Sequence, residues 1–268
     1  MIIAEIGLNH LGSRQLIESY IEKLIDTDID AVTLQVREPE YYNTKWNDYD
    51  LELDKDVYFY VKDKLHSAGK KFGIAIADIN YIYFFESVGV DFYKVIRNDI
   101  TNFELIDKLK DTGKEIIVST GLSSDKDISK FINHIGDNKN FKLNHTQLSY
   151  DVEDCNLSAI ENMRQKYGLD VSFGSHCNNL TVLYMSLCYN PSDILFYIKL
   201  DKTGKFPDDK HSVTLHDVLE VSANLKKLSN ALGTGTKVKM NNKLEPKELT
   251  AEEKKNIDAD SWDNTMWG

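Results

Sequence analysis

The N-terminal stretch Ile2-Ile3-Ala4-Glu5-Ile6-Gly7-Leu8-Asn9-His10 indicates the fold class of this chain. Its beginning, Ile2–Ile6, is a short and mostly apolar run, which is typical of a buried parallel strand. Ser13 then has the character of a helix N-cap, and Leu16–Ile25 carries apolar residues at helical spacing. The stretch therefore predicts a strand that is followed directly by a helix.

The same alternation of short apolar runs and longer amphipathic segments continues along the chain. Eight such units in about 250 residues fit a single-domain (β/α)₈ TIM barrel better than an open sheet. We expect strands at Ile2–Ile6, Ala31–Gln35, Lys71–Ala75, Phe92–Ile96, Glu115–Ser119, Phe141–His145, Val171–Gly174 and Ile194–Ile198. The barrel would occupy residues 1–235, with its last helix at Leu215–Leu232, and residues 236–268 would form a polar C-terminal extension.

The amino-acid composition of the chain argues against some classes of binding partner. The chain has 268 residues, of which 28% are charged, and its formal net charge is −11. Such a chain has no electrostatic reason to bind nucleic acid or an anionic membrane, and no apolar run approaches the roughly 20 residues that span a bilayer. The three cysteines fit free thiols in a reducing compartment, and the N-terminus lacks a signal-peptide pattern. We therefore expect a cytoplasmic protein that acts on small molecules.

Polar residues gather where the predicted strands end. Active sites of barrels of this type lie at the C-terminal ends of the strands, so these side chains would converge on one mouth. The residues concerned are Glu5, Asn9, His10, Gln35, Arg37, Lys94, Arg97, Ser119, Thr120, His145 and His176. The long polar and aromatic segment Arg37–Asp54 is predicted to be a functional loop beside them.

Each of these residues also has a purely structural interpretation. A single histidine at a strand end is usually just hydrogen-bonded, but His145 and His176 on adjacent strands could share one metal ion. Lys94 interrupts an apolar strand, and a buried ammonium needs either an ion-pair partner or an anion. The turn Ser119-Thr120-Gly121 fits ordinary turn chemistry as well as a phosphate site.

Several segments, in this order, resemble motifs of the sialic acid (N-acetylneuraminate) synthase family over roughly residues 2–233. They are Ala4–Gly12, Ser119–Leu122, His145–Leu157, Gly174-Ser175-His176, and Pro207-Asp208 with Lys210. The resemblance implies condensation of phosphoenolpyruvate with an open-chain aldose, such as N-acetylmannosamine or a related amino sugar, to give a 2-keto-3-deoxy sugar acid. It also implies a divalent cation, with Mn²⁺ expected first and Mg²⁺ or Co²⁺ as alternatives.

The resemblance assigns roles to individual residues. His145 and His176 would hold the cation, and Glu5 would orient the metal-bound aldehyde or water, or shuttle a proton. The other catalytic residues would be Asn9, His10 and Gln35. The substrate-binding residues would be Arg37, Lys94, Arg97, Ser119, Thr120, Asp208 and Lys210.

The chain departs from the family pattern where the family binds phosphate. Thr33 replaces a lysine, Ala75 lies where a polar turn is usual, Arg97 replaces a small residue, and Phe196 lies where strand eight usually carries charged residues. Arg37 or Arg97 could supply the missing charge, because a guanidinium binds phosphate in a bidentate manner.

These departures leave three hypotheses. The first is an active synthase with an altered acceptor, and the second is a divergent barrel that kept the metal site but is a different lyase or aldolase. The third is a non-catalytic sugar-binding protein, because we expect the chain to lack the family's C-terminal antifreeze-like domain. In relatives that domain reaches the partner subunit's site and contributes to the dimer, which leaves a homodimer through other faces open.

Overall fold

The computed structural model describes residues 1–96 and 99–237. Within these ranges the predicted strands are present, each with bounds that differ from the expected ones by at most one residue. The strands are β1 Ile2–Gly7, β2 Ala31–Val36, β3 Lys71–Ile76, β4 Phe92–Val95, β5 Glu115–Ser119, β6 Phe141–His145, β7 Val171–Ser175, β8 Ile194–Lys199 and the short β9 Val213–Thr214.

Helices connect consecutive strands. They are α1 Arg14–Leu24, α2 Pro39–Tyr42, α3 Lys55–Ser67, α4 Ile82–Val88, α5 Phe103–Lys110, α6 Asp125–Ile135, α7 Ala159–Tyr167, α8 Leu180–Met185 and α9 Val218–Leu232. Shorter 3-10 turns are η1 Ile79–Tyr81, η2 Asp99–Thr101, η3 Val152–Asp154, η4 Ser186–Tyr189 and η5 Asp209–His211. The first helix begins as expected, since the Ser13 hydroxyl accepts a hydrogen bond from the Leu16 amide.

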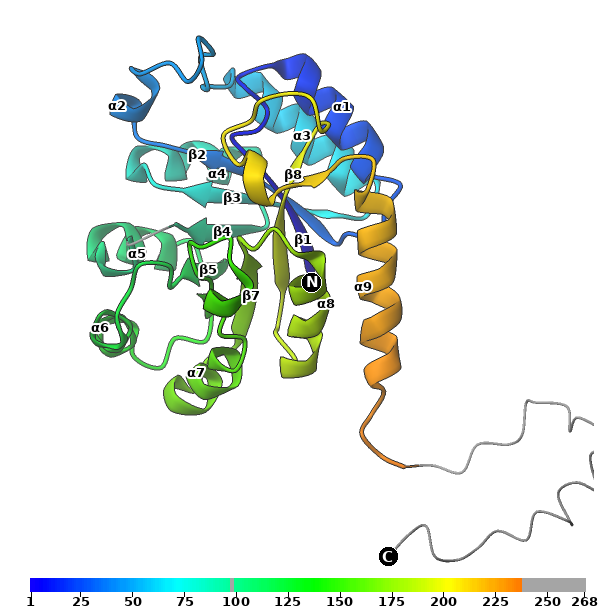
Figure 1. Cartoon of the computed structure of the whole chain (residues 1–268). Coiled ribbons are helices and arrows are strands. Elements are labelled where there is room, and N and C mark those ends of the chain that lie inside the picture. Colours follow the sequence, from blue (N-terminus) through cyan, green and yellow to red (C-terminus); the bar gives the residue numbers. More distant parts are fainter. Residues whose placement is uncertain (97–98, 238–268) are drawn as a thin grey trace, which may run out of the picture. The chain divides into compact units, whose positions relative to one another are not determined.

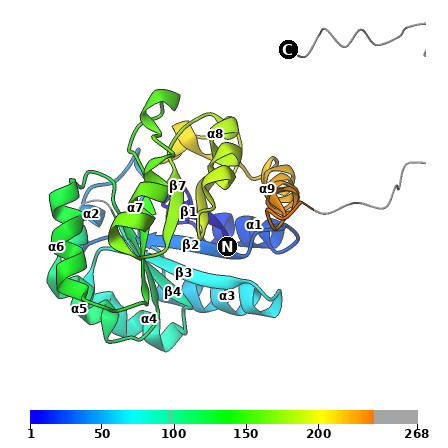
Figure 2. The same ribbon diagram turned by 90° about the horizontal axis from the view of Figure 1, so that it is seen from below.

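The strands form a closed parallel barrel. Each strand pairs with the next from β1 to β8, and β1 also pairs with β8, beginning at Ile2 opposite Ile194. The helices lie outside the strands (Figure 1), and the view from below shows α1 and α3 to α9 around them (Figure 2). The prediction of a (β/α)₈ TIM barrel is therefore confirmed.

Successive residues of each strand face opposite sides of the barrel wall. One set points inward, where Ile3, Phe92, Ile117 and Leu195 pack against each other at the bottom of the barrel. Gly73 leaves room for this packing, because a Cβ there would lie 2.3 Å from Cζ of Phe92. The other set packs against the helices and forms the main hydrophobic core.

Side chains of β6 and β7 also alternate between the inward face and the helix side of the barrel wall. Leu143 and Phe173 belong to the core between the strands and the helices. Asn144 and Ser172 point inward, and the Ser172 hydroxyl donates a hydrogen bond of 3.1 Å to Oδ1 of Asn144. Gly174 is on the same inward face, since a Cβ there would lie 2.6 Å from the Asn144 amide. This alternation determines which strand-end residues can face the barrel mouth.

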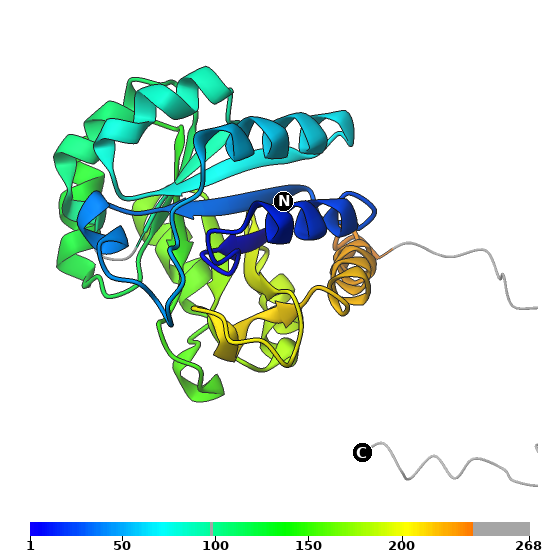
Figure 3. The same ribbon diagram turned by 90° about the horizontal axis from the view of Figure 1, so that it is seen from above.

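Two loops cover that mouth. The segment Arg37–Asp54 contains α2 and an isolated bridge between Trp46 and Tyr49, and it buries Leu51 and Leu53. The segment after β8 returns through η5 to β9, which pairs in parallel with β8. In the view from above, this segment (yellow) lies beside the loop that follows β1 (dark blue) (Figure 3).

The last expected helix begins three residues later than predicted. Thr214 belongs to β9, and its hydroxyl donates a hydrogen bond of 2.6 Å to the Asp217 carboxylate immediately before α9. Met1–Leu232 forms one compact unit. The extension expected at residues 236–268 lies outside the described residues from residue 238 onward. In the part of the chain that is described, no helix has the length and apolar character to cross a membrane.

Candidate functional site

A cavity of about 300 Å³ lies at the C-terminal ends of the strands. Side chains from β2, β4 and β8, the end of β5, the residues after β6 and β7, and both covering loops line it. The lining residues are Leu8, Gln35, Tyr41, Trp46, Lys94, Ile96, Ser119, Thr146, Leu148, Tyr150, His176, Tyr197, Pro207, Asp208 and His211. The cavity thus lies where barrel enzymes carry their active sites.

A buried ion pair connects opposite sides of the barrel beneath the cavity. Nζ of Lys94 lies 2.5 Å from Oε1 of Glu5, and the two side chains are only 4% and 2% exposed. The Thr33 hydroxyl donates a longer hydrogen bond of 3.4 Å to the same Glu5 oxygen. Lys94 also lies 5.7 Å from the centre of the Tyr197 ring. Lys94 is therefore paired with a countercharge and also lines the cavity.

Two further predicted residues offer hydrogen-bonding groups to the cavity. Gln35 at the end of β2 and Ser119 at the end of β5 are buried and line it. Thr120 is directed elsewhere, because its backbone amide and its hydroxyl both donate to the Asn144 carbonyl, each at 3.0 Å. Of the turn Ser119-Thr120-Gly121, Ser119 is the residue that can meet a ligand.

The basic residues that were predicted to bind substrate do not all line the cavity. Arg37 is buried beside the cavity, where its guanidinium stacks on Tyr41 at 4.5 Å and Nε donates to Glu38. Its Nη1 is buried with no hydrogen-bond partner in the described ranges. Lys210 is exposed, and its ammonium lies 5.2 Å from the centre of the Tyr150 ring. Arg97 lies outside the described residues.

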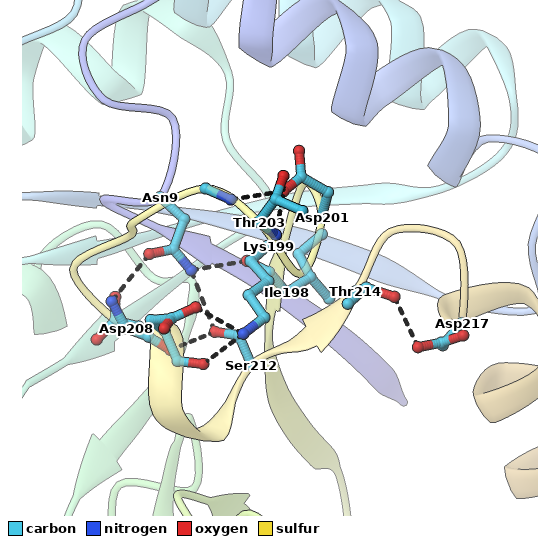
Figure 4. A network of polar contacts seen from close by, with 11 residues as sticks. Asn9, Ile198, Lys199, Asp201, Thr203, Asp208, Ser212, Thr214 and Asp217 are labelled. Carbon is cyan, nitrogen blue, oxygen red and sulfur yellow. Dashed lines mark hydrogen bonds and ion pairs between the residues drawn. The ribbon is translucent and has the colours of Figure 1, made fainter.

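Asn9 holds the loop that carries Asp208. Its Nδ2 donates to the Ile198 carbonyl at 2.8 Å and to the Ser212 hydroxyl at 3.2 Å, and its Oδ1 accepts from the Asp208 amide at 3.0 Å (Figure 4). Asp208 lines the cavity. Asn9 therefore acts on the cavity by positioning this loop.

His10, which follows Asn9 in the sequence, is buried. Its Nδ1 accepts a hydrogen bond of 3.0 Å from the Gly12 amide, and its Nε2 is buried without a partner among the described residues. Burial lowers the pKa of His10 to about 3, so the ring is neutral at pH 7. Neither Asn9 nor His10 is among the residues that line the cavity in the described ranges.

The two histidines that were predicted to share an ion have different surroundings in the structure. His145 is on the same face of β6 as Leu143, which is the helix side of the barrel wall, and its ring lies 6.3 Å from that of Phe173. Its Nε2 is 3.0 Å from the Cys155 carbonyl oxygen. Burial lowers the pKa of His145, while hydrogen bonds to the backbone of Cys155 and Asn156 oppose this shift.

His176 lines the cavity, and it follows Ser172 and Gly174, which lie on the inward face of β7 beside Asn144. Its Nδ1 is 2.9 Å from the Thr146 hydroxyl, and its ring centre is 4.7 Å from that of His211. Burial, followed by the charges of His211 and Lys94, lowers the pKa of His176 to about 3. Burial, followed by Lys94 and Lys199, lowers the pKa of His211 to about 4.

The expected cation therefore fits these residues only in part. His176 presents a neutral imidazole to the cavity, whereas the nitrogens of His145 interact with the backbone of the 155–156 loop. Within the described residues, no group of three or more His, Cys, Asp or Glu side chains is arranged to hold a metal ion. Two imidazoles do meet in the cavity, but they are His176 and His211.

Sequence reasoning missed part of the cavity lining. Tyr197 was not among the predicted site residues, although the alternation of β8 places it inward, two residues after Leu195. Tyr41 and Trp46 come from the insertion that was predicted to be functional, so their presence could have been anticipated. His211 follows Asp208 by three residues, and no spacing rule in the sequence indicated that it would reach His176.

Comparison with solved structures supports the fold. The N-acetylneuraminic acid (sialic acid) synthetase of Leptospira borgpetersenii, solved in complex with citrate, superposes with a TM-score of 0.80 at 24% identity. The match covers 96% of this chain and 90% of that structure.

Two curated relatives are synthases by name. The N,N'-diacetyllegionaminic acid synthase of Campylobacter jejuni is 25% identical, over 88% of this chain and 78% of the relative. The N-acetylneuraminate-9-phosphate synthase of Homo sapiens is also 25% identical, over 94% of this chain and 75% of the relative. These relatives are enzymes that form carbon–carbon bonds, so the expectation of a sialic acid synthase-like enzyme is confirmed.

The family comparison covers most of the barrel. The model described as "NeuB family" matches residues 20–237, which include all of the cavity-lining residues except Leu8. The match confirms the resemblance that the sequence motifs indicated. This chain belongs to the NeuB family.

Proposed function

We propose that this protein condenses phosphoenolpyruvate with an aldose to form a 2-keto-3-deoxy sugar acid and inorganic phosphate. Family membership and the synthase relatives support the reaction class. The observation that carries the proposal is the buried pair of Lys94 and Glu5, with Lys94 lining the cavity. A lysine that is held at the base of an enclosed cavity suits an anionic substrate, because its remaining N–H groups can donate charge-assisted hydrogen bonds.

The reaction needs a bond between C3 of phosphoenolpyruvate and the aldehyde carbon of the sugar. Water adds at C2, the phosphate leaves with its bridging oxygen, and the former aldehyde oxygen takes up a proton. Lys94 would bind the carboxylate or the phosphate, with Gln35 and Ser119 donating further hydrogen bonds. Glu5 would keep Lys94 in place and could shuttle the proton.

The sugar would bind toward the outer part of the cavity. Tyr41, Trp46, Tyr150 and Tyr197 line it, and aromatic side chains with a few polar groups are typical of small-molecule sites. Because Tyr41 and Trp46 come from the Arg37–Asp54 insertion, we propose that this segment selects the acceptor, whether an N-acetylmannosamine-like sugar or another aldose. A divalent cation, Mn²⁺ before Mg²⁺ or Co²⁺, is part of the proposal, and when bound it would polarise the aldehyde oxygen.

The test is release of phosphate from phosphoenolpyruvate with a panel of aldoses in the presence of Mn²⁺. At least one aldose should support release, and Lys94→Met should lower kcat/KM at least about 100-fold, as loss of one electrostatic contact to a reacting group does. Lys202→Met is the matched control, because that lysine is 77% exposed and outside the cavity lining.

Absence of phosphate release with every aldose would contradict the proposal. Calorimetry would then show whether the protein still binds phosphoenolpyruvate, which separates the synthase from the two alternatives that the sequence left open. Sugar binding without phosphoenolpyruvate binding would favour a different lyase or aldolase, or a non-catalytic sugar-binding protein. A cytoplasmic location and a homodimer remain predictions.

A further inference from the structure

Two cysteine thiols meet between the loops that follow β6 and β7. Cys155 and Cys177 are both buried and free, whereas the third cysteine of the chain, Cys188, is exposed. Burial, followed by a hydrogen bond with the Cys177 thiol, raises the pKa of Cys155 to about 12. The two thiols are therefore close enough to interact, although two different loops carry them.

Backbone carbonyls of one short segment hold both sulfurs in place. The Cys155 sulfur lies 3.5 Å from the Asp151 carbonyl oxygen, and the Cys177 sulfur lies 3.3 Å from the Tyr150 carbonyl oxygen. The Asn178 amide also donates to the Tyr150 carbonyl, at 3.4 Å. Residues 150–151 thus bring the two cysteine-bearing loops together, whatever the protonation state of the thiols.

Cys177 can be reached from solvent. It lines a second cavity, of about 310 Å³, between the loop after β7 and the segment from β8 to β9. Lys199, Lys202 and Lys210 line the same cavity, and it opens to solvent at Lys202, whose side chain is 77% exposed. Since a water molecule takes up about 30 Å³ in the liquid, the cavity has room for a small oxidant. Cys155 is not among the residues that line it in the described ranges, so such an oxidant would meet Cys177 first.

We propose that Cys155 and Cys177 form a reversible disulfide when a hydroperoxide oxidises the protein. Hydrogen peroxide oxidises the Cys177 thiol to a sulfenic acid and is itself reduced to water. The Cys155 sulfur then attacks the Cys177 sulfur and releases a second water, so two thiols and one peroxide give one disulfide and two waters. A dithiol returns both cysteines to thiols. Disulfides of proteins in reducing compartments are usually transient and redox-sensing, which suits a pair of free thiols in contact.

The disulfide would act on the candidate site through both histidine segments. Cys177 directly follows His176, which lines the cavity at the strand ends, and the Cys155 carbonyl oxygen lies 3.0 Å from Nε2 of His145. Two bonded sulfurs lie closer together than two sulfurs that are only in contact, so formation of the bond moves both loops. A displacement of about 1 Å near reacting groups can lower a rate about 100-fold. Oxidation should therefore lower kcat/KM for phosphate release at least about tenfold, an effect that rests on the proposed function.

The test is a count of thiols in the full chain, denatured after treatment with hydrogen peroxide and removal of the excess. The reduced chain has three thiols, and the oxidised chain should keep one until dithiothreitol restores all three. Peptide mapping of the unreduced protein should link Cys155 to Cys177. Trypsin does not suit this mapping, because no Lys or Arg lies between Cys177 and Cys188, whereas chymotrypsin separates them by cutting after Tyr184.

Cys188→Ser is the matched control, because that thiol is exposed. This variant should lose both of its thiols to peroxide, whereas Cys177→Ser should give no linked peptide. The mapping of the unaltered chain does not depend on variants that fold. A linkage that includes Cys188, or oxidation of Cys177 to a sulfinic acid without a disulfide, would overturn the proposal.

The thiol count and the mapping need no turnover. A disulfide between Cys155 and Cys177 in a chain that releases no phosphate with any aldose would uphold the redox pair and contradict the proposed reaction. A disulfide that leaves the rate of phosphate release unchanged would show that the pair does not control the site.

Discussion

Separating Glu5 from Lys94 should destabilise the barrel strongly. The two charged atoms are 2.5 Å apart and almost fully buried. At an effective dielectric constant near 20, their attraction is about 7 kcal/mol, and the cost of removing both charges from water offsets much of it. Glu5→Gln keeps the shape of the side chain but leaves the ammonium of Lys94 without a countercharge. We expect this variant to lower the free energy of unfolding by about 3–5 kcal/mol.

The assay is a double-mutant cycle in urea. Glu5→Gln, Lys94→Met and the double variant are unfolded with circular dichroism as the signal, and the free energies are extrapolated linearly to water. The double variant should recover much of the loss, with a coupling energy of up to about 3 kcal/mol. Lys202→Met, at an exposed lysine, should change stability by no more than about 0.5 kcal/mol. If the two single changes add within about 0.5 kcal/mol, the pair is not a coupled buried ion pair and the reasoning is refuted.

Three further predictions concern the loops and the region around β1. Gly12 and Gly69 both have left-handed φ angles, but a Cβ at Gly12 would lie 1.9 Å from the carbonyl oxygen of Asp50, while Gly69 has open space. Gly12→Ala should therefore lower Tm far more than Gly69→Ala, which should cost only about 1–2 kcal/mol; equal shifts would contradict the packing. His10 has a folded pKa of about 3, so below pH 6.5 the unfolded chain takes up a proton that the folded chain does not. The free energy of unfolding should therefore fall by about 1.4 kcal/mol for each pH unit between pH 6.5 and pH 3 because of His10 alone. In urea titrations at pH 7 and pH 5, His10→Gln should lose less stability between the two pH values than the unaltered chain does. Asn9→Ala removes the hydrogen bonds to Ile198, Ser212 and Asp208, so trypsin should cut the adjacent loop about 5- to 30-fold faster; an unchanged rate would show that Asn9 does not hold it.

The sequence predicted the barrel strands closely because each strand interior reads as a short apolar run. β5 and β6 have the expected bounds, Glu115–Ser119 and Phe141–His145. The sequence missed β9, since two residues, Val213–Thr214, carry no readable pattern. It also began α9 too early, because an apolar residue such as Leu215 fits a helix face as well as the turn it occupies.

The sequence predicted some residues of the cavity and their roles, but not their partners. Placing Lys94 and Ser119 at the mouth required only the order of strands, and both line the cavity. The partner of Lys94 could not be assigned, because Glu5 is 89 residues away and the two meet across the barrel. The sequence predicted a catalytic role for Asn9 but did not indicate that its side chain accepts a hydrogen bond from the Asp208 amide.

The sequence by itself determined the fold class, the family and the strand ends where polar side chains gather, because these depend on local apolar periodicity and on motifs in order. The tertiary structure alone decided which way those side chains point. Both faces of these strands carry apolar residues, so the apolar pattern alone does not reveal which residues face inward. The alternation of successive side chains between the two faces of a strand directs His145 toward the helices and His176 toward the cavity. The pairing of β9 with β8 brings His211 close to His176.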